Sequence, residues 1–259
     1  MLVLGLEPRS FALSLKGKKG DPASDGRQMP GHWSLKRVNV LSHSSVIAAQ
    51  TPQAVGVAVG IKLRGEDKVV LHTTGEGATA MGEWYESVNW AAIHKLPVVF
   101  LVENNQYAIS MRQESQMGVE NVAEKAMGLG LAGVTVDGSD FTAVQRAVAE
   151  AVFRARNGNG PTLVEARTYR ITPHSSDDDD RNYRPKKEVE AYRNRDPLLV
   201  ARTFLESEDI LDPERNSQME ARAVEIAEDA MRFALEAPYP APDEALGPVY
   251  ASGDEICLP

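Results

Sequence analysis

The chain has 259 residues, of which 42% are hydrophobic, and a formal net charge of −9 at pH 7. This length and composition suit one large α/β domain with a helical tail, and no stretch approaches the roughly 20 apolar residues that a membrane span requires. The negative charge argues against nucleic acid as the main partner. Because Cys257 is the only cysteine, no internal disulfide can form, and we expect a cytoplasmic protein without a membrane segment.

The first part of the chain carries few structural signals. Residues 1–20 have no clear pattern, and Lys16–Gly20 is expected to be a loose basic linker. Residues 21–45 are rich in turn-forming residues and are expected to be coil. The segment Gln50–Leu63 combines small and apolar residues, which predicts a buried helix.

A strand–helix–strand unit follows. Val69–Thr73 is a short apolar run that predicts a buried strand, an amphipathic helix is expected from near Gly82, and Val98–Val102 predicts a second buried strand. A right-handed crossover places two such strands side by side and parallel. The sequences that follow the strands, Gly-Glu-Gly at 75–77 and Asn-Asn at 104–105, therefore emerge at the same carboxyl edge, where open α/β sheets bind ligands.

The remaining pattern extends the α/β prediction. Further elements are expected as helices at Val122–Leu131, Phe141–Arg156, about Leu198–Glu206 and about Ser217–Glu236, and as strands at Gly133–Val136 and Thr162–Arg167. Residues 172–187 are expected to form a long polar loop around Asp177–Asp180. We predict an atypical segment at 1–20, a main domain at 21–240 and a Pro-rich tail at 241–259.

The residues at the shared strand edge suit a magnesium–diphosphate site. The Glu76 carboxylate, the Asn105 amide oxygen and a nearby backbone carbonyl are the hard oxygen ligands that magnesium prefers. Gly75 and Gly77 let the backbone approach a phosphate, and a helix starting near Gly82 would point its N–H groups at the negative charge. Taken singly, these features are more often structural turns, so the prediction depends on their joint spacing.

The surrounding sequence closely resembles a known family. The run GEGATAMGEWYESVNWAAIHKLPVVFLVENNQYAIS is similar to the thiamine-diphosphate motif in the alpha subunit of the decarboxylating component of 2-oxo acid dehydrogenases. The likeness continues through GRQMPGHW, SSVIAAQTPQAVG, VDGSD, PTLVEARTYRITPHSSDDDDRNYR and DPLL, and covers roughly residues 20–240. It is closest to the branched-chain type because of the glutamate in GEG, the GRQMP segment and the HSSDDDD loop.

The resemblance implies a three-layer thiamine-diphosphate-binding fold with a mostly parallel central sheet flanked by helices. The implied cofactor-binding residues are Ser45, Gly75, Glu76, Gly77, Ala78, Asn105, Tyr107, Arg170 and His174. The implied magnesium ligands are Glu76, Asn105 and the Tyr107 backbone carbonyl. His174 is the implied catalytic residue, which contacts the diphosphate and assists reductive acylation, and Arg170 is a candidate for orienting the same loop.

Three features of the family match only in part. Ser44 and Gln50 match positions that hold potassium in some branched-chain members, but Ala49 replaces a threonine ligand, so a potassium site is left open. Ser175 matches a serine that is phosphorylated in animal enzymes, and we favour an ordinary loop hydroxyl. Nothing in residues 1–20 resembles the upstream Tyr-Arg segment of the family, and we therefore expect the N-terminal segment to be missing.

The implied function is oxidative decarboxylation of a 2-oxo acid, with transfer of the acyl group to lipoyl on an acyltransferase core. The implied partners are that core and a beta subunit, in a heterotetramer of two alpha and two beta chains, without which this chain is expected to be inactive. A pyruvate or acetoin dehydrogenase alpha subunit is the alternative within the family. A non-catalytic module that binds magnesium and diphosphate or serves in assembly is the alternative from another class.

Overall fold

The computed structural model describes residues 1–247, which form two compact units. One unit contains Met1–Ser45 together with the chain from Asp212 onward, and the other contains Val46–Leu211. The division predicted at residues 20 and 240 follows other boundaries and stays a prediction. All of the candidate cofactor residues except Ser45 belong to the unit Val46–Leu211.

The unit Val46–Leu211 is built on a parallel sheet of four strands in the order β1-β2-β6-β5. The strands are β1 (Val70–Gly75), β2 (Val98–Asn104), β5 (Ala132–Asp137) and β6 (Thr162–Arg167). Gly75 pairs with Glu103, and Asn104 pairs with Arg167, so the carboxyl ends of three neighbouring strands lie level with one another. The predicted crossover is therefore confirmed, and it brings the Gly-Glu-Gly and Asn-Asn sequences to one edge.

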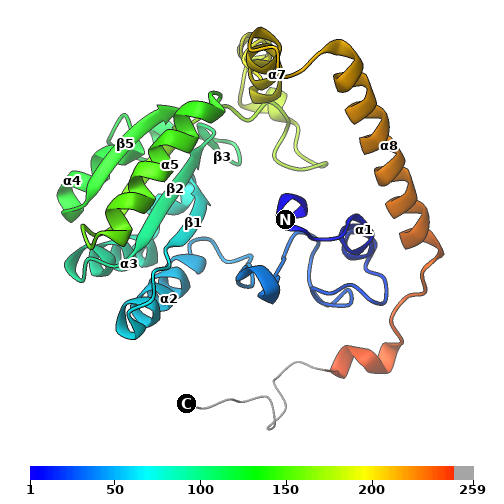
Figure 1. Cartoon of the computed structure of the whole chain (residues 1–259), viewed down its shortest axis with the longest axis horizontal. Helices are drawn as coiled ribbons and strands as arrows, with labels where there is room; N and C mark the ends of the chain where they lie inside the picture. Colours follow the sequence, from blue (N-terminus) through cyan, green and yellow to red (C-terminus); the bar gives the residue numbers. More distant parts are fainter. Residues whose placement is uncertain (248–259) are drawn as a thin grey trace. The chain divides into compact units, whose positions relative to one another are not determined.

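Helices cover both faces of this sheet. The main helices of the unit are α2 (Gln50–Arg64), α3 (Gly82–Ile93), α4 (Lys125–Leu129), α5 (Phe141–Arg156), α6 (Lys186–Arg193) and α7 (Pro197–Ser207). In β2, Phe100 and Val102 pack with α2, α3 and α4, whereas Val99 and Leu101 pack with α5, which crosses in front of the strands in Figure 1. Alternate side chains of a strand point to opposite faces, so both faces of β2 are apolar from Val98 to Val102. The predicted three-layer α/β architecture is confirmed.

Local capping explains why the predicted and observed bounds of α5 agree. The Asp140 carboxylate accepts hydrogen bonds from the backbone N–H groups of Thr142 at 2.9 Å and Ala143 at 3.2 Å, which satisfies donors at the start of the helix. Gly158 follows the last turn with a φ of +71°, a conformation that favours glycine. Both signals are local and can be read from the sequence.

Several elements differ from the prediction. The helix predicted over Val122–Leu131 is a short 3₁₀ turn, η5, followed by α4, because Asn121 and Glu124 form a capping box and Gly130 ends the helix with a φ of +73°. A hairpin of β3 (Tyr107–Ala108) and β4 (Met111–Arg112) follows the Asn-Asn sequence. Helix α6 begins inside the region predicted as a loop.

The 3₁₀ turns of residues 1–247 are η1 (Leu2–Leu4), η2 (Lys36–Val38), η3 (Glu76–Ala80), η4 (Gln113–Ser115), η5 (Val122–Glu124), η6 (Asp180–Asn182) and η7 (Pro242–Leu246).

The other unit pairs two helices from opposite ends of the chain, α1 (Pro8–Lys16) and α8 (Pro213–Glu236). They share a small apolar cluster of Ala12, Leu13, Ala230 and Ala234. The Arg9 guanidinium also pairs with the Asp229 carboxylate at 2.8 Å. Helix α1 was not predicted, because nine residues are too few to show a periodic pattern.

The basic segment Lys16–Gly20 was expected to be a loose linker, and this is wrong for Lys18. The Lys18 side chain is buried, donates a hydrogen bond to the Ala237 carbonyl at 2.7 Å and lies over the Tyr239 ring. Lys18 therefore fixes the end of α8. The predicted tail 241–259 contains η7, and its part from 248 lies outside the described residues. Within residues 1–247, none of the helices has the length and apolar character needed to cross a bilayer.

Candidate functional site

The structure brings Glu76 and Asn105 into direct contact. Glu76 follows β1 at the start of η3, and Asn105 follows β2. The backbone N–H of Asn105 donates a hydrogen bond to Oε2 of Glu76 at 3.2 Å. Because β1 and β2 are parallel and level, the Glu76 side chain and the Asn105 backbone meet at adjacent strand ends. The proximity predicted from the spacing is therefore seen.

The Glu76 carboxylate is only half satisfied. Glu76 is 1% exposed, and its second oxygen, Oε1, has no hydrogen-bond partner among the described residues. Burial raises the pKa of Glu76, while hydrogen bonds from the backbone N–H groups of Glu76 and Asn105 and the charge of Arg170 act in the opposite direction. A buried carboxylate oxygen without a partner is costly, and a bound cation would supply the missing interaction.

The other two predicted metal ligands lie on the turn that enters β3. The Asn105 amide oxygen accepts a hydrogen bond from the N–H of Tyr107 at 3.2 Å, and the Tyr107 carbonyl accepts one from Nη1 of Arg170 at 3.2 Å. An amide or carbonyl oxygen has two lone pairs, so each retains one for a cation. Across residues 1–247 there is no cluster of three or more His, Cys, Asp and Glu side chains with metal-binding geometry. The candidate cation site therefore combines one carboxylate with neutral oxygens, and this donor set fits magnesium.

Gly77 has a packing role that was not predicted from the sequence. A Cβ built on Gly77 would lie 2.7 Å from the Ala108 Cβ, which is too close for two carbon atoms. A Cβ on Gly75 would meet nothing within 4 Å, so the space beside Gly75 is open. Ala78 is buried in the core beneath the same turn. Gly77 therefore allows the η3 turn to pack against the β3–β4 hairpin.

Glu165 fixes the Asn-Asn sequence from inside the sheet, and sequence analysis missed it. Its carboxylate is fully buried and accepts hydrogen bonds from Nδ2 of Asn104 at 2.6 Å, the Ala123 N–H at 3.0 Å and the Thr135 hydroxyl at 2.9 Å. The Asn104 amide oxygen in turn accepts a hydrogen bond from the N–H of Gln106 at 3.0 Å. A glutamate between apolar residues in the middle of a predicted strand was the signal that could have revealed this network.

The ring of Tyr107 is held by a second carboxylate, Glu188 on α6. Glu188 accepts hydrogen bonds from the hydroxyls of Tyr107 at 2.8 Å and Tyr169 at 2.9 Å, and it also pairs with Arg112. Burial and these bonds to Glu188 raise the pKa of both tyrosines. The backbone that carries the Tyr107 carbonyl is therefore attached to α6, an element that was not predicted.

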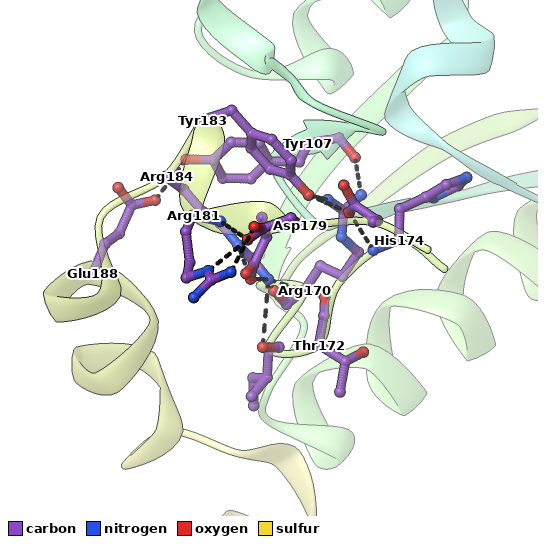
Figure 2. A network of polar contacts seen from close by, with 12 residues as sticks. Tyr107, Arg170, Thr172, His174, Asp179, Arg181, Tyr183, Arg184 and Glu188 are labelled. Atoms are coloured by element: carbon purple, nitrogen blue, oxygen red, sulfur yellow. Dashed lines mark hydrogen bonds and ion pairs between the residues drawn. The ribbon is translucent and has the colours of Figure 1, made fainter. Parts of the chain in front are cut away.

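The acidic loop after β6 is organised by arginines (Figure 2). The buried Arg184 side chain pairs with Asp180 at 2.6 Å and donates hydrogen bonds to the carbonyls of Arg170 and, at 3.0 Å, Thr172. Asp179 pairs with Arg181 at 2.7 Å. Asp179 and Asp180 therefore each have a guanidinium partner a few positions further along the chain.

The start of this loop carries the candidate catalytic residue, His174. The His174 side chain is exposed, and Figure 2 shows its ring pointing away from the arginine–aspartate network. The backbone N–H of His174 donates to the Asp178 carboxylate at 2.8 Å. Nη2 of Arg170 donates to the Tyr183 hydroxyl at 2.9 Å, and Nη1 reaches Tyr107. The structure therefore connects Arg170 with both the Tyr107 turn and the acidic loop.

The remaining sequence candidates are divided between the two units. Ser45 belongs to the unit that contains Met1, where its hydroxyl is 2.5 Å from Nε2 of His32. Ser44 belongs to the same unit, whereas Gln50 begins α2 in the other. The roles of these residues toward a cofactor or potassium stay predictions.

Comparison with known proteins identifies the family. The model of the family described as "Dehydrogenase E1 component" matches residues 1–243. The chain belongs to the dehydrogenase E1 component family. The family predicted from the sequence motifs is thereby confirmed, and the family model spans both units of the described structure.

Alpha subunits of this family are among the similar curated proteins. The 2-oxoisovalerate dehydrogenase subunit alpha of Bacillus subtilis is 43% identical over 97% of this chain and 76% of its own length. The pyruvate dehydrogenase E1 component subunit alpha of B. subtilis is 42% identical over 81% of this chain and 54% of its own length. The 3-methyl-2-oxobutanoate dehydrogenase subunit alpha of Mycobacterium tuberculosis is 40% identical over 79% of this chain.

The chain thus spans about three quarters of the first of these relatives, and 54% and 56% of the other two. Two of the three are named for the same branched-chain 2-oxo acid. The expected likeness to the branched-chain type is supported by the first of these relatives, which matches 97% of this chain.

Proposed function

We propose that this chain is the alpha subunit of the decarboxylating component of a 2-oxo acid dehydrogenase and that it holds the magnesium and diphosphate of thiamine diphosphate. The observation that carries the proposal is the buried Glu76 carboxylate, which leaves Oε1 without a partner beside Asn105. A buried polar atom without a partner calls for an explanation, and a bound cation at this oxygen provides one. Burial also raises the pKa of Glu76, and a divalent cation would stabilise the ionised form.

Each residue of the site has a separate part in this proposal. Glu76, Asn105 and the Tyr107 carbonyl would hold magnesium, while the backbone from Gly75 to Ala78 would face the diphosphate. Bound thiamine diphosphate supplies the electron sink for decarboxylation of a 2-oxo acid. Arg170 donates to the Tyr107 carbonyl and thereby orients it.

His174 is the residue we propose to act on the reacting groups. Its exposed imidazole can donate a hydrogen bond to the diphosphate or carry a proton during transfer of the acyl group to lipoyl. This role comes from the family resemblance. The support from the structure is that Arg170 and Asp178 connect the His174 loop to the turn that carries Tyr107.

The partners and substrate follow from the family relationship. We propose a complex of two alpha and two beta chains that delivers acyl groups to a lipoyl acyltransferase core in the cytoplasm. A branched-chain 2-oxo acid is the favoured substrate, because the 2-oxoisovalerate relative matches 97% of this chain. Pyruvate is the second candidate, because the pyruvate relative is 42% identical. A potassium ion near Ser44 and Gln50 is a further proposal that rests on the sequence likeness alone.

The substitution Glu76→Gln distinguishes a loss of cofactor binding from a loss of stability. Because the folded-state pKa of Glu76 is raised, its ionised form is destabilising and the native state loses stability as pH rises through that pKa. The neutral variant should therefore be at least as stable as the wild type at pH 7 without cofactor. In the complex with the beta subunit, it should lose magnesium-dependent binding of thiamine diphosphate in calorimetry.

The matched control is Glu150→Gln, which changes an exposed glutamate on α5. It should leave both the stability and the cofactor binding unchanged. Wild-type affinity for magnesium and thiamine diphosphate in the Glu76→Gln complex would refute the assignment of the site.

A further inference from the structure

Lys125 contacts the turn that carries Glu76. Its ammonium nitrogen lies 2.9 Å from the Thr79 carbonyl oxygen and 2.9 Å from the Thr79 hydroxyl oxygen. Thr79 is fully buried, and its hydroxyl donates a hydrogen bond to the Glu76 carbonyl at 2.7 Å. Lys125 is therefore connected through one side chain to the backbone of Glu76.

The same ammonium also contacts the start of α3. It lies 5.6 Å from the centre of the Trp84 ring and 5.3 Å from the centre of the Tyr85 ring, distances at which a cation is attracted to an aromatic ring. Trp84 is fully buried, so its ring is a fixed surface. Lys125 thus joins η3 to the first turn of α3, which flank the candidate diphosphate position.

The location of Lys125 in its own helix points to the same role. Lys125 is the first residue of α4 and directly follows η5. The backbone before it is held by Glu165, which accepts a hydrogen bond from the Ala123 N–H and also fixes Asn104. One buried carboxylate therefore determines the positions of both the Asn-Asn sequence and the base of Lys125.

We propose that Lys125 is a positioning residue that holds the η3 backbone in the conformation in which Glu76 can bind the cation. This inference rests on the proposed function for its effect on magnesium. The contacts of Lys125 with Thr79 lie within this chain and involve no bound cofactor. Partners that orient a metal ligand typically change metal affinity about 10- to 100-fold when they are removed.

The test compares Lys125→Met, Lys125→Arg and Thr79→Val with Lys187→Met, a control that changes an exposed lysine on α6. In the 259-residue chain without cofactor, Lys125→Met should accelerate amide hydrogen exchange across residues 76–81, and Lys125→Arg should restore protection. In the complex with the beta subunit, Lys125→Met should raise the magnesium concentration for half-maximal cofactor binding about tenfold or more. Thr79→Val should have the same effect, and the double variant should add little further loss.

The outcomes distinguish the inference from the proposed function. A wild-type complex that binds no cofactor refutes the proposed function, and hydrogen exchange in the chain alone still tests the positioning. Unchanged exchange at 76–81 in both Lys125→Met and Thr79→Val overturns the inference, even if magnesium binding is weaker, because the lysine then acts only through its charge. Faster exchange of equal size in Lys187→Met also overturns it.

Discussion

Replacing Gly77 by alanine should disturb the contact between the η3 turn and the β3–β4 hairpin. The new Cβ would lie 2.7 Å from the Ala108 Cβ, whereas carbon atoms in contact are normally about 3.5–4.0 Å apart. The hairpin would have to move by about 0.8 Å or more to relieve the overlap. Overpacking of this kind typically costs about 1–3 kcal/mol of stability.

The same displacement would affect the site, because Ala108 directly follows Tyr107, whose carbonyl is a proposed magnesium ligand. Urea unfolding of the chain measures the loss of stability, and calorimetry of the complex measures magnesium-dependent cofactor binding. We expect Gly77→Ala to lower both the stability of the chain and the cofactor affinity of the complex. Gly82→Ala is the matched control, since a Cβ there meets nothing within 4 Å.

A second substitution tests the cause. With Ala108→Gly, the nearest atoms to the new Cβ are Oε1 of Gln116 at 3.4 Å and the backbone Cα of residue 108 at 3.8 Å, which are acceptable contacts. The double variant should therefore recover most of the stability that Gly77→Ala loses, less the roughly 0.5–1 kcal/mol cost of glycine in a strand. Strictly additive losses from the two substitutions would refute the steric reasoning.

Three further predictions concern His72, the acidic loop and His174. Burial lowers the pKa of His72 from its ordinary value of 6.5 to about 4. As the pH falls, the unfolded chain binds the proton before the native state does, so the native state should lose about 2 kcal/mol of stability between pH 7 and pH 5. His72→Gln should lack this part of the pH dependence in urea unfolding. Arg184→Met should speed tryptic cleavage after Arg181, since it removes the buried guanidinium that joins both ends of the loop, and equal cleavage rates would contradict that role. In the active complex, His174→Ala should impair acyl transfer to lipoyl more than decarboxylation measured with an artificial electron acceptor, and equal losses would count against the assigned role.

Local patterns in the sequence were sufficient to predict the arrangement of the sheet edge. The apolar runs before residues 75 and 104 and the helix between them specify a crossover, and a parallel crossover requires Glu76 and Asn105 to meet. Helix α5 was predicted with its observed bounds because its capping residues lie next to it in the sequence. These features depend on neighbouring residues and on general rules of chain connection.

The interactions that hold the site depend on residues far apart in the sequence. Glu188 lies 81 positions from Tyr107, and Glu165 lies 61 positions from Asn104, so neither pairing has a local signature. Arg184 also donates hydrogen bonds to the carbonyls of Arg170 and Thr172, which lie 14 and 12 positions earlier, and these contacts likewise have no local signature. Such networks require the tertiary structure to be known.

Co-expression of this chain with its beta subunit, followed by an assay of a panel of 2-oxo acids, tests the central claim most directly. With magnesium and thiamine diphosphate present, we expect the purified complex to release carbon dioxide from a branched-chain 2-oxo acid and to acylate a lipoyl domain. The Glu76→Gln complex, which should assemble normally, should do neither, and Glu150→Gln should match the wild type. A complex that binds no cofactor, or that turns over equally well with Glu76→Gln, would contradict the account.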